Sequence, residues 1–133
     1  MIVPDEILNF TFKDMYHGFA ECHGNLFLDE NSITIEYFVK DSIIGFFKSN
    51  IKRVKIKYSE IINTEIKKKF FKRYFLIVRI KSLNNIIDLP FIDENAKLSI
   101  KISKSSLLTA EEISSYINYR VAENKLSKID NNY

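Results

Sequence analysis

The chain has no tryptophan, one cysteine, two prolines and three glycines among its 133 residues. A single cysteine excludes an internal disulfide, which suits a reducing compartment. So few prolines and glycines leave no room for a Pro- or Gly-rich linker. No segment approaches the roughly 20 apolar residues of a membrane-spanning helix, and the start "MIVPDEILNF" lacks the pattern of a signal peptide. We therefore expect a soluble, cytoplasmic protein.

The composition is that of a folded protein. Hydrophobic residues make up 46% of the chain and charged residues 28%, with 18 phenylalanines and tyrosines as core material. A chain of this length most simply forms one domain with one core. The net charge of +3 hides an asymmetry, because residues 48–81 hold 12 of the 20 basic residues and only two acidic ones. Such a distribution can steer an anionic partner toward one part of the molecule.

The dominant sequence pattern is an alternation of apolar and polar residues. In "SITIEYFV" (32–39), Ile33 and Ile35 fall on one face, and Thr34 and Glu36 fall on the other. This period of two, with β-branched and aromatic enrichment, is typical of half-buried antiparallel strands. The triplet "DEN" at 29–31 predicts a tight hairpin turn. The pattern predicts about seven strands, at 23–28, 32–39, 46–58, 60–68, 74–82, 86–89 and 97–103.

The period changes to that of a helix after Ser105. Ile113, Ile117 and Val121 recur at helical spacing, with Tyr116 beside them. Thr109 is a suitable N-cap, and Glu112 then occupies the N3 position of a capping box. We expect a helix over 109–123 that covers the open end of a bent sheet.

These patterns divide the chain into three parts. We expect residues 1–19 to be irregular or a short helix, 20–124 to form the folded domain, and 125–133 to be a frayed tail.

The order of strands and helix resembles the pleckstrin-homology superfold, specifically the small bacterial PH-like and GRAM-like domains. The resemblance is carried by "HGNLFLDENSITIEY", by "FFKSNIKRVKIKYSEI", by "YFLIVRI" and by the terminal helix. It implies a mainly β fold, a PH-like barrel of about seven antiparallel strands with a C-terminal capping α-helix. It also implies a non-enzymatic interaction module that binds a protein partner or self-associates. In lipid-binding members the first hairpin loop is basic, whereas here it is Asp29-Glu30-Asn31, which would repel a phosphate.

The segment "IKKKFFKRYFLIVRIK" (66–81) is the most unusual part of the chain. Seven of its sixteen residues are basic and none is acidic. One interpretation is an ordinary hairpin, in which the lysines are a solvated face that discourages edge-to-edge aggregation. Another is binding to an anionic membrane surface, and a third, weaker one is stacking on nucleic-acid bases. The candidate residues for an anionic surface are Lys67, Lys68, Lys69, Phe70, Phe71, Lys72 and Arg73.

The position of the two adjacent phenylalanines distinguishes these interpretations. If Phe70 and Phe71 are buried, the segment is an ordinary hairpin and membrane binding loses its apolar anchor. If both are exposed beside the lysines, binding is the better interpretation.

No pattern in the sequence predicts catalysis, a metal or a cofactor. His17, Cys22 and His23 are three ligand types close together, but a fourth ligand at a known spacing is missing. Cys22 and His23 cannot act as nucleophile and base, because adjacent residues of a strand point to opposite faces. We therefore expect no catalytic residues, no metal site and no cofactor, and we expect a protein partner, a second copy or an anionic lipid rather than nucleic acid.

Overall fold

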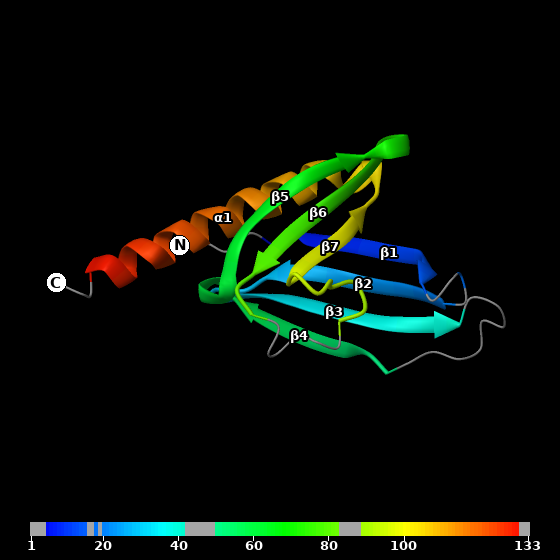
Figure 1. Cartoon of the computed structure of the whole chain (residues 1–133), viewed down its shortest axis with the longest axis horizontal. Helices are drawn as coiled ribbons and strands as arrows, with labels where there is room; N and C mark the ends of the chain where they lie inside the picture. The colour runs from blue at the N-terminus through cyan, green and yellow to red at the C-terminus, as the bar shows by residue number, and fades with distance from the viewer. Residues whose placement is uncertain (1–4, 16–17, 19, 42–49, 83–88, 131–133) are drawn as a thin grey trace.

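The protein consists of two antiparallel sheets and one long C-terminal helix (Figure 1). The computed structural model describes residues 5–15, 18, 20–41, 50–82 and 89–130. The first sheet has the order β1-β2-β3-β4, and the second has the order β5-β6-β7. The strands are β1 (Ile7–Met15), β2 (Ala20–Leu28), β3 (Ser32–Asp41), β4 (Lys52–Lys57), β5 (Ile61–Lys69), β6 (Arg73–Ile80) and β7 (Lys97–Ile102).

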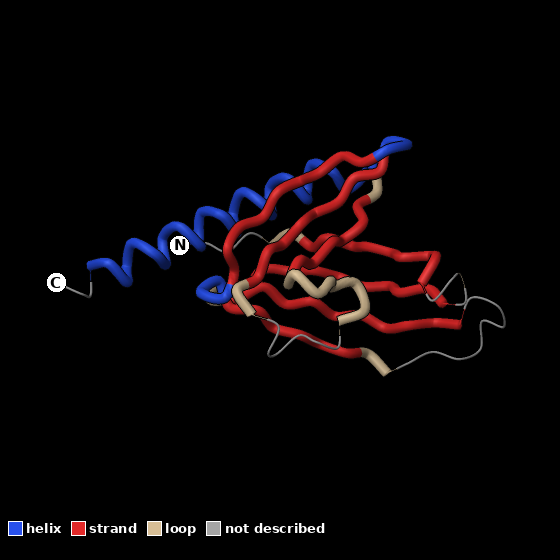
Figure 2. Tube along the Cα trace, in the orientation of Figure 1, coloured by secondary structure: helices blue, strands red, loops and turns tan. Residues whose placement is uncertain are grey.

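Helix α1 (Leu107–Asp130) follows β7 after a short 3-10 turn, and it packs mainly against β5. A second 3-10 turn at Tyr58–Glu60 carries the chain from the first sheet into the second. Figure 2 shows that the two sheets lie face to face at an angle, with the helix running beside β5. A mainly β fold with antiparallel strands and one C-terminal helix is therefore confirmed, while the two sheets formed by the described residues are not closed into a barrel.

The core forms where the alternating apolar residues of both sheets meet the helix. Ile33 and Ile35 of β3 are fully buried, as are Leu98 and Ile100 of β7. The helix contributes the stripe that the sequence predicted, with Ala110, Ile113, Ile117 and Val121 all buried in the same cluster. Since each strand presents one apolar face to this cluster, the period-two pattern was a sound guide to the interior.

Three expectations about segment boundaries were wrong. Residues 1–19 are not an irregular or short helical segment throughout, because Ile7–Met15 forms strand β1 paired with β2. The tail is not frayed over 125–130, because α1 continues to Asp130. Thr109 is not an N-cap, since the helix already begins at Leu107.

The predicted strand at 86–89 falls almost wholly outside the described residues, and Leu89 itself is buried but belongs to no strand. The predicted strand at 46–58 is shorter, because only Lys52–Lys57 forms β4 among its described residues. The remaining five predicted strands are confirmed with ends that differ by a few residues.

One polar cluster ties the helix to the edge strand β5. Asn118 accepts a hydrogen bond from the Thr64 backbone N–H at 2.8 Å and donates one to the Thr64 carbonyl at 2.9 Å. The Thr64 hydroxyl also lies 2.6 Å from the Ser114 hydroxyl. The Asn118 side chain thus replaces the neighbouring strand that β5 lacks at this position, and it satisfies two backbone groups that burial would otherwise leave unpaired.

Candidate functional site

The candidate site is the end of the β5–β6 hairpin, residues 67–73, which we call the hairpin tip. Lys69 pairs with Arg73 in the ladder, and a three-residue 3-10 segment, Phe70–Lys72, closes the turn. The predicted hairpin is therefore confirmed, and all seven candidate residues lie together at its end. In Figure 2 this turn projects away from both sheets.

The two phenylalanines of the hairpin tip are fully accessible to solvent. Phe70 is 89% exposed and Phe71 is 92% exposed, the two largest values among the exposed large hydrophobic residues. Neither contributes to the core cluster. Both rings are exposed beside the lysines, which is the position under which the sequence favours binding, and binding itself stays a prediction.

The backbone of the turn is unfavourable for the side chains it carries. Phe71 has φ 62° and ψ 34°, and Lys72 has φ 56°, so both lie in the left-handed region. This region costs a residue with a Cβ roughly 1–2 kcal/mol, and glycine or asparagine is the usual occupant. The turn therefore carries a phenylalanine and a lysine at a cost to stability, which is typical of positions that serve binding.

Five basic residues flank the two rings of the hairpin tip. All five basic residues of the hairpin tip are exposed, and within the described residues none of them forms an ion pair. Glu65 is the acidic residue closest along β5, and its carboxylate lies 2.7 Å from Arg79. The hydrogen bond and charge of Arg79 lower the pKa of Glu65 below its usual value. Glu65 is thus ionised, and besides its pair with Arg79 it interacts electrostatically with Lys67 of the hairpin tip.

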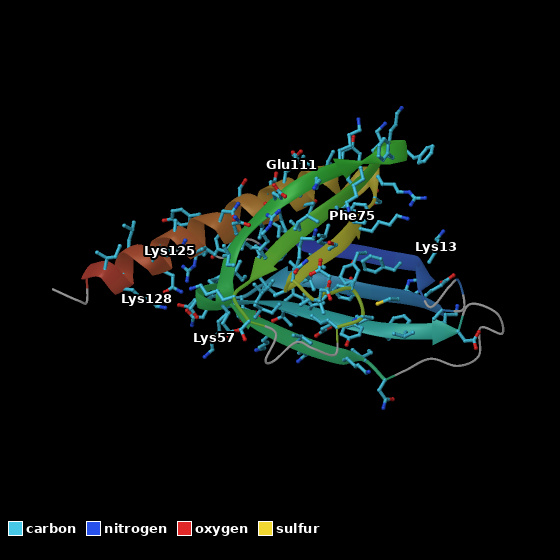
Figure 3. The ribbon with its side chains drawn as sticks, in the orientation of Figure 1. Lys13, Lys57, Phe75, Glu111, Lys125 and Lys128 are labelled. Carbon is cyan, nitrogen blue, oxygen red and sulfur yellow. The ribbon has the colours of Figure 1, made fainter. Side chains whose placement is uncertain are left out.

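Two of the lysines lie along aromatic rings of the neighbouring strand. The Lys69 ammonium is 4.8 Å from the centre of the Phe75 ring, and that of Lys68 is 5.8 Å from the centre of the Tyr74 ring. These cation–π contacts hold the lysine stems against β6. Figure 3 shows Phe75 on β6 and nitrogen-tipped side chains spreading outward beyond it.

The acidic loop of the first hairpin is held by hydrogen bonds from within the protein. The Tyr58 hydroxyl donates to the Asp29 carbonyl at 2.9 Å, and Arg120 donates to the Glu30 carbonyl at 2.5 Å. Thr34 donates to the Asp29 carboxylate. The loop is therefore a structural junction between the first sheet and the helix.

The Cys22 and His23 side chains lie on opposite faces of β2. Cys22 is fully buried in the core, and burial raises the pKa of its thiol to about 11. His23 lies on the outer face, where its Nδ1 is 3.3 Å from the Thr11 hydroxyl and its Nε2 is 3.0 Å from Glu21. His17 lies outside the described residues. Among the residues that are described, no three histidine, cysteine or acidic side chains gather as metal ligands would.

The outer face of the first sheet carries a shallow groove that sequence reasoning missed. It has a volume of about 270 Å³ and is lined by residues of β1, β2 and β3, including Thr11, His23 and Phe38. His23 stacks on Phe38 with 5.3 Å between the ring centres. Hydrogen bonds connect the Thr11 hydroxyl, the His23 imidazole and the Glu21 carboxylate on this face. The partner Thr11 went unseen because residues 1–19 were not expected to form a strand.

Comparisons with models of known protein families, with curated proteins and with solved structures gave no match for this chain. Within the described residues, no helix has both the length and the apolar character needed to cross a bilayer. The function must therefore be argued from the geometry of the hairpin tip.

Proposed function

We propose that the protein is a non-enzymatic module that binds anionic membrane surfaces peripherally through the hairpin tip. The observation that carries this proposal is the pair of exposed rings, Phe70 and Phe71, at the end of a hairpin that also holds five cations. The rings would enter the interface between headgroups and acyl chains. The cations would remain at the level of the lipid phosphates.

The magnitudes suggest that charge and insertion are both required. Each basic residue near an anionic surface contributes about 1 kcal/mol, so five contribute about 5 kcal/mol. That amount alone corresponds to a dissociation constant near the millimolar range. Burial of a phenylalanine contributes about 1.5–3 kcal/mol, so partial insertion of two rings brings the total to about 8 kcal/mol and the affinity to the micromolar range.

The shape of the hairpin tip favours binding to a membrane surface over binding to single-stranded nucleic acid. Single-stranded nucleic acid binds along a basic groove in which successive bases stack on aromatic rings. Here both rings sit on a projecting turn, at adjacent residues, and the flanking cations face outward on both strands (Figure 3). A projecting tip can reach into a bilayer surface, whereas it offers a polymer no path to follow.

The PH-like identity and the cytoplasmic location belong to the same proposal. About seven antiparallel strands followed by a C-terminal helix is the order that the resemblance implies, and the seven described strands and helix α1 follow that order, which supports a PH-like architecture. The buried cysteine suits a reducing cytoplasm. The lipid-facing element would differ from that of inositol-phosphate-binding relatives, because the loop at Asp29 is acidic and engaged by Tyr58 and Arg120.

Co-sedimentation with vesicles tests the proposal. The wild-type protein should bind vesicles of phosphatidylserine and phosphatidylcholine at low salt, bind them weakly at high salt, and ignore vesicles of phosphatidylcholine alone. Reversal of Lys67, Lys68 and Lys69 to glutamate should abolish binding.

The matched control reverses the three exposed lysines of β4, Lys52, Lys55 and Lys57, which changes the net charge equally. This control should retain most of the binding, because its charges lie away from the hairpin tip. Equal loss in both triple variants would show that binding depends on net charge alone. Absence of binding to acidic vesicles at low salt would end the proposal, and tight binding to single-stranded nucleic acid that depends on Phe70 would replace it with the nucleic-acid alternative.

A further inference from the structure

The outer face of the second sheet continues the basic surface of the hairpin tip. Lys67 of β5 pairs with Phe75 of β6, and Phe75 in turn pairs with Lys101 of β7. Residues that lie directly opposite one another on neighbouring strands share a face of the sheet. Lys101 therefore lies on the same face as Lys67, with the ring of Phe75 between them.

A cleft adjoins this face where the second sheet meets the first. It has a volume of about 390 Å³ and lies between β1 and β7, which contact each other but belong to different sheets. We call it the seam cleft. None of the residues that line it is acidic, and its polar lining consists of Asn9, Thr11, Lys13, Lys101, Ser103 and Ser106.

The two lysines of the seam cleft approach it from opposite walls. Lys13 belongs to β1 and is exposed, whereas Lys101 belongs to β7 and is half-buried. Within the described part of the chain neither lysine forms an ion pair. Figure 3 shows Lys13 and Phe75 toward the same end of the molecule, far from the labelled lysines of helix α1. The seam cleft thus presents two positive charges close to the hairpin tip.

The serine hydroxyls beside these lysines form a directed chain of hydrogen bonds. The Ser103 hydroxyl donates to the Ser106 hydroxyl at 3.0 Å and lies 3.1 Å from the Ser105 hydroxyl. Because Ser103 has a single hydroxyl proton and gives it to Ser106, Ser105 is the donor in the second bond. The Ser106 hydroxyl keeps its own proton, which it can donate to an acceptor in the seam cleft.

Two cations, a hydroxyl donor and a lining free of carboxylates suit a phosphomonoester. Such a group carries about −1.5 to −2 charges at pH 7 and three strong acceptor oxygens, and lysine binds phosphate as a point charge. The headgroup of phosphatidylserine carries an ammonium group as well, and the seam cleft has no acidic lining residue to receive it. The chemistry of the cleft therefore distinguishes between two kinds of anionic headgroup.

We propose that the seam cleft binds the phosphomonoester headgroup of an anionic lipid while the hairpin tip is inserted in the membrane. This inference rests on the proposed function, and it names the lipid that the same surface prefers. Phe75 lies four residues beyond Phe71, so Lys101 beside it is at a level at most about 13 Å from the turn, at about 3.3 Å per residue. Interfacial segments enter the headgroup region by about 5–10 Å, and insertion of the hairpin tip therefore brings the seam cleft close to the lipid phosphates.

Vesicles of matched surface charge test the preference. Phosphatidylcholine vesicles would contain either phosphatidic acid or phosphatidylserine, with the mole fractions adjusted to give equal charge. The wild-type protein should bind the phosphatidic acid vesicles about tenfold more tightly, which is the contribution of one hydrogen bond to a charged group. Lys13→Gln with Lys101→Gln should bind both kinds of vesicle equally, because this double variant keeps the hairpin tip. Lys13→Gln alone, at an exposed residue, should lower the preference to about threefold.

The matched control is Lys55→Gln with Lys97→Gln. Lys55 is exposed like Lys13, and Lys97 is a half-buried lysine of β7 like Lys101, but neither lines the seam cleft. This control removes the same two charges and should keep the tenfold preference. A preference that survives in the Lys13 and Lys101 double variant would overturn the inference.

Glycerol 3-phosphate separates a lipid headgroup from a soluble phosphate ester. At constant ionic strength it should lower the affinity for phosphatidic acid vesicles to that for phosphatidylserine vesicles and leave the latter unchanged. Calorimetric binding of glycerol 3-phosphate without any preference between the vesicles would assign the cleft to a soluble ester and overturn the lipid inference. Equal wild-type affinity for both vesicles, without such binding, would overturn the inference and leave the proposed function standing, whereas no binding to either vesicle would overturn both.

Discussion

Replacing Phe71 with glycine should separate the stability of the hairpin turn from its binding function. Phe71 is 92% exposed and has a φ of 62°. Glycine adopts this backbone conformation without a steric penalty. The substitution therefore removes an apolar anchor and relieves backbone strain at the same time, so the two properties should change in opposite directions.

The expected magnitudes follow from the geometry of the turn. Relief of the left-handed conformation is worth about 1–2 kcal/mol, and the greater freedom of glycine in the unfolded chain offsets about 0.5–1 kcal/mol of it. The net gain of about 0.5–1 kcal/mol should raise the melting temperature by about 2–4 °C. Loss of one ring removes about 1.5 kcal/mol, half of the insertion energy of the two partly inserted rings, which is a roughly tenfold weaker affinity for acidic vesicles.

Phe70→Gly is the matched control. Phe70 is 89% exposed, like its neighbour, but it lies outside the left-handed region. It should lose vesicle affinity to a similar degree without any gain in melting temperature. Thermal unfolding and vesicle co-sedimentation measure the two properties separately. If Phe71→Gly binds acidic vesicles as tightly as the wild type, the ring is not an anchor, and if it melts at a lower temperature, the argument from strain is wrong.

Three further predictions concern the fold that supports the hairpin tip. Asn118→Ala should destabilise the protein by about 1–3 kcal/mol in urea unfolding, because it leaves the Thr64 N–H and carbonyl without their partner. An unchanged midpoint of urea unfolding would show that water replaces the Asn118 side-chain amide. Gly24→Ala should cost about 1–3 kcal/mol by overpacking, since the new Cβ would lie 2.3 Å from the ring of Phe10, and a melting temperature equal to that of the wild type would contradict this. The Cys22 thiol has a pKa raised to about 11 by burial, against an ordinary 9.0. A thiol reagent at pH 8 should therefore label Cys22 rapidly only after the protein unfolds, and rapid labelling of the native protein would refute the burial of this thiol. The free energy of unfolding should also fall as the pH rises from 9 toward 11, because the Cys22 thiol ionises at a lower pH in the unfolded chain than in the folded protein.

The sequence was most informative where apolar residues recurred at one regular spacing over a whole strand or helix. Both "SITIEYFV" and "KLSIKIS" became strands, and their alternating isoleucines and leucine are buried as predicted, although Thr34 on the other face of β3 is buried as well. Ile113, Ile117 and Val121 recur at helical spacing, and all three are buried against the sheets. Such patterns depend only on which side of an element meets the core, so a single chain suffices to recognise them.

The errors arose where two local signals competed. The segment "ILNFTFKDM" does alternate, but the neighbouring proline and the acidic residues at 5 and 6 obscured strand β1. Thr109 and Glu112 form a plausible capping box, yet the chain enters the helix through a 3-10 turn at Lys104–Ser106. Helix ends are decided by such tertiary packing as well as by propensity.

The candidate site itself was recognisable in composition but not in geometry. The run of lysines and phenylalanines was visible in the sequence, whereas the exposure of Phe70 and Phe71 and the backbone of Phe71 were not. Two adjacent phenylalanines are more often core residues, so only their place on a projecting turn distinguishes anchoring from packing. The contact between Asn118 and Thr64 joins residues 54 positions apart, beyond the reach of any local pattern.

Fluorescence of a single tryptophan at the hairpin tip tests the central claim most directly. The chain has no tryptophan, so Phe71→Trp creates a reporter with no tryptophan background. Ile51→Trp is the control, because Ile51 is 67% exposed and precedes β4 of the other sheet. With vesicles that contain phosphatidylserine and brominated acyl chains, emission of Phe71→Trp should shift to the blue and be quenched, while that of the control should stay unchanged. Emission from Phe71→Trp that remains at the wavelength of a water-exposed indole, at saturating acidic lipid and low salt, would contradict insertion of the hairpin tip.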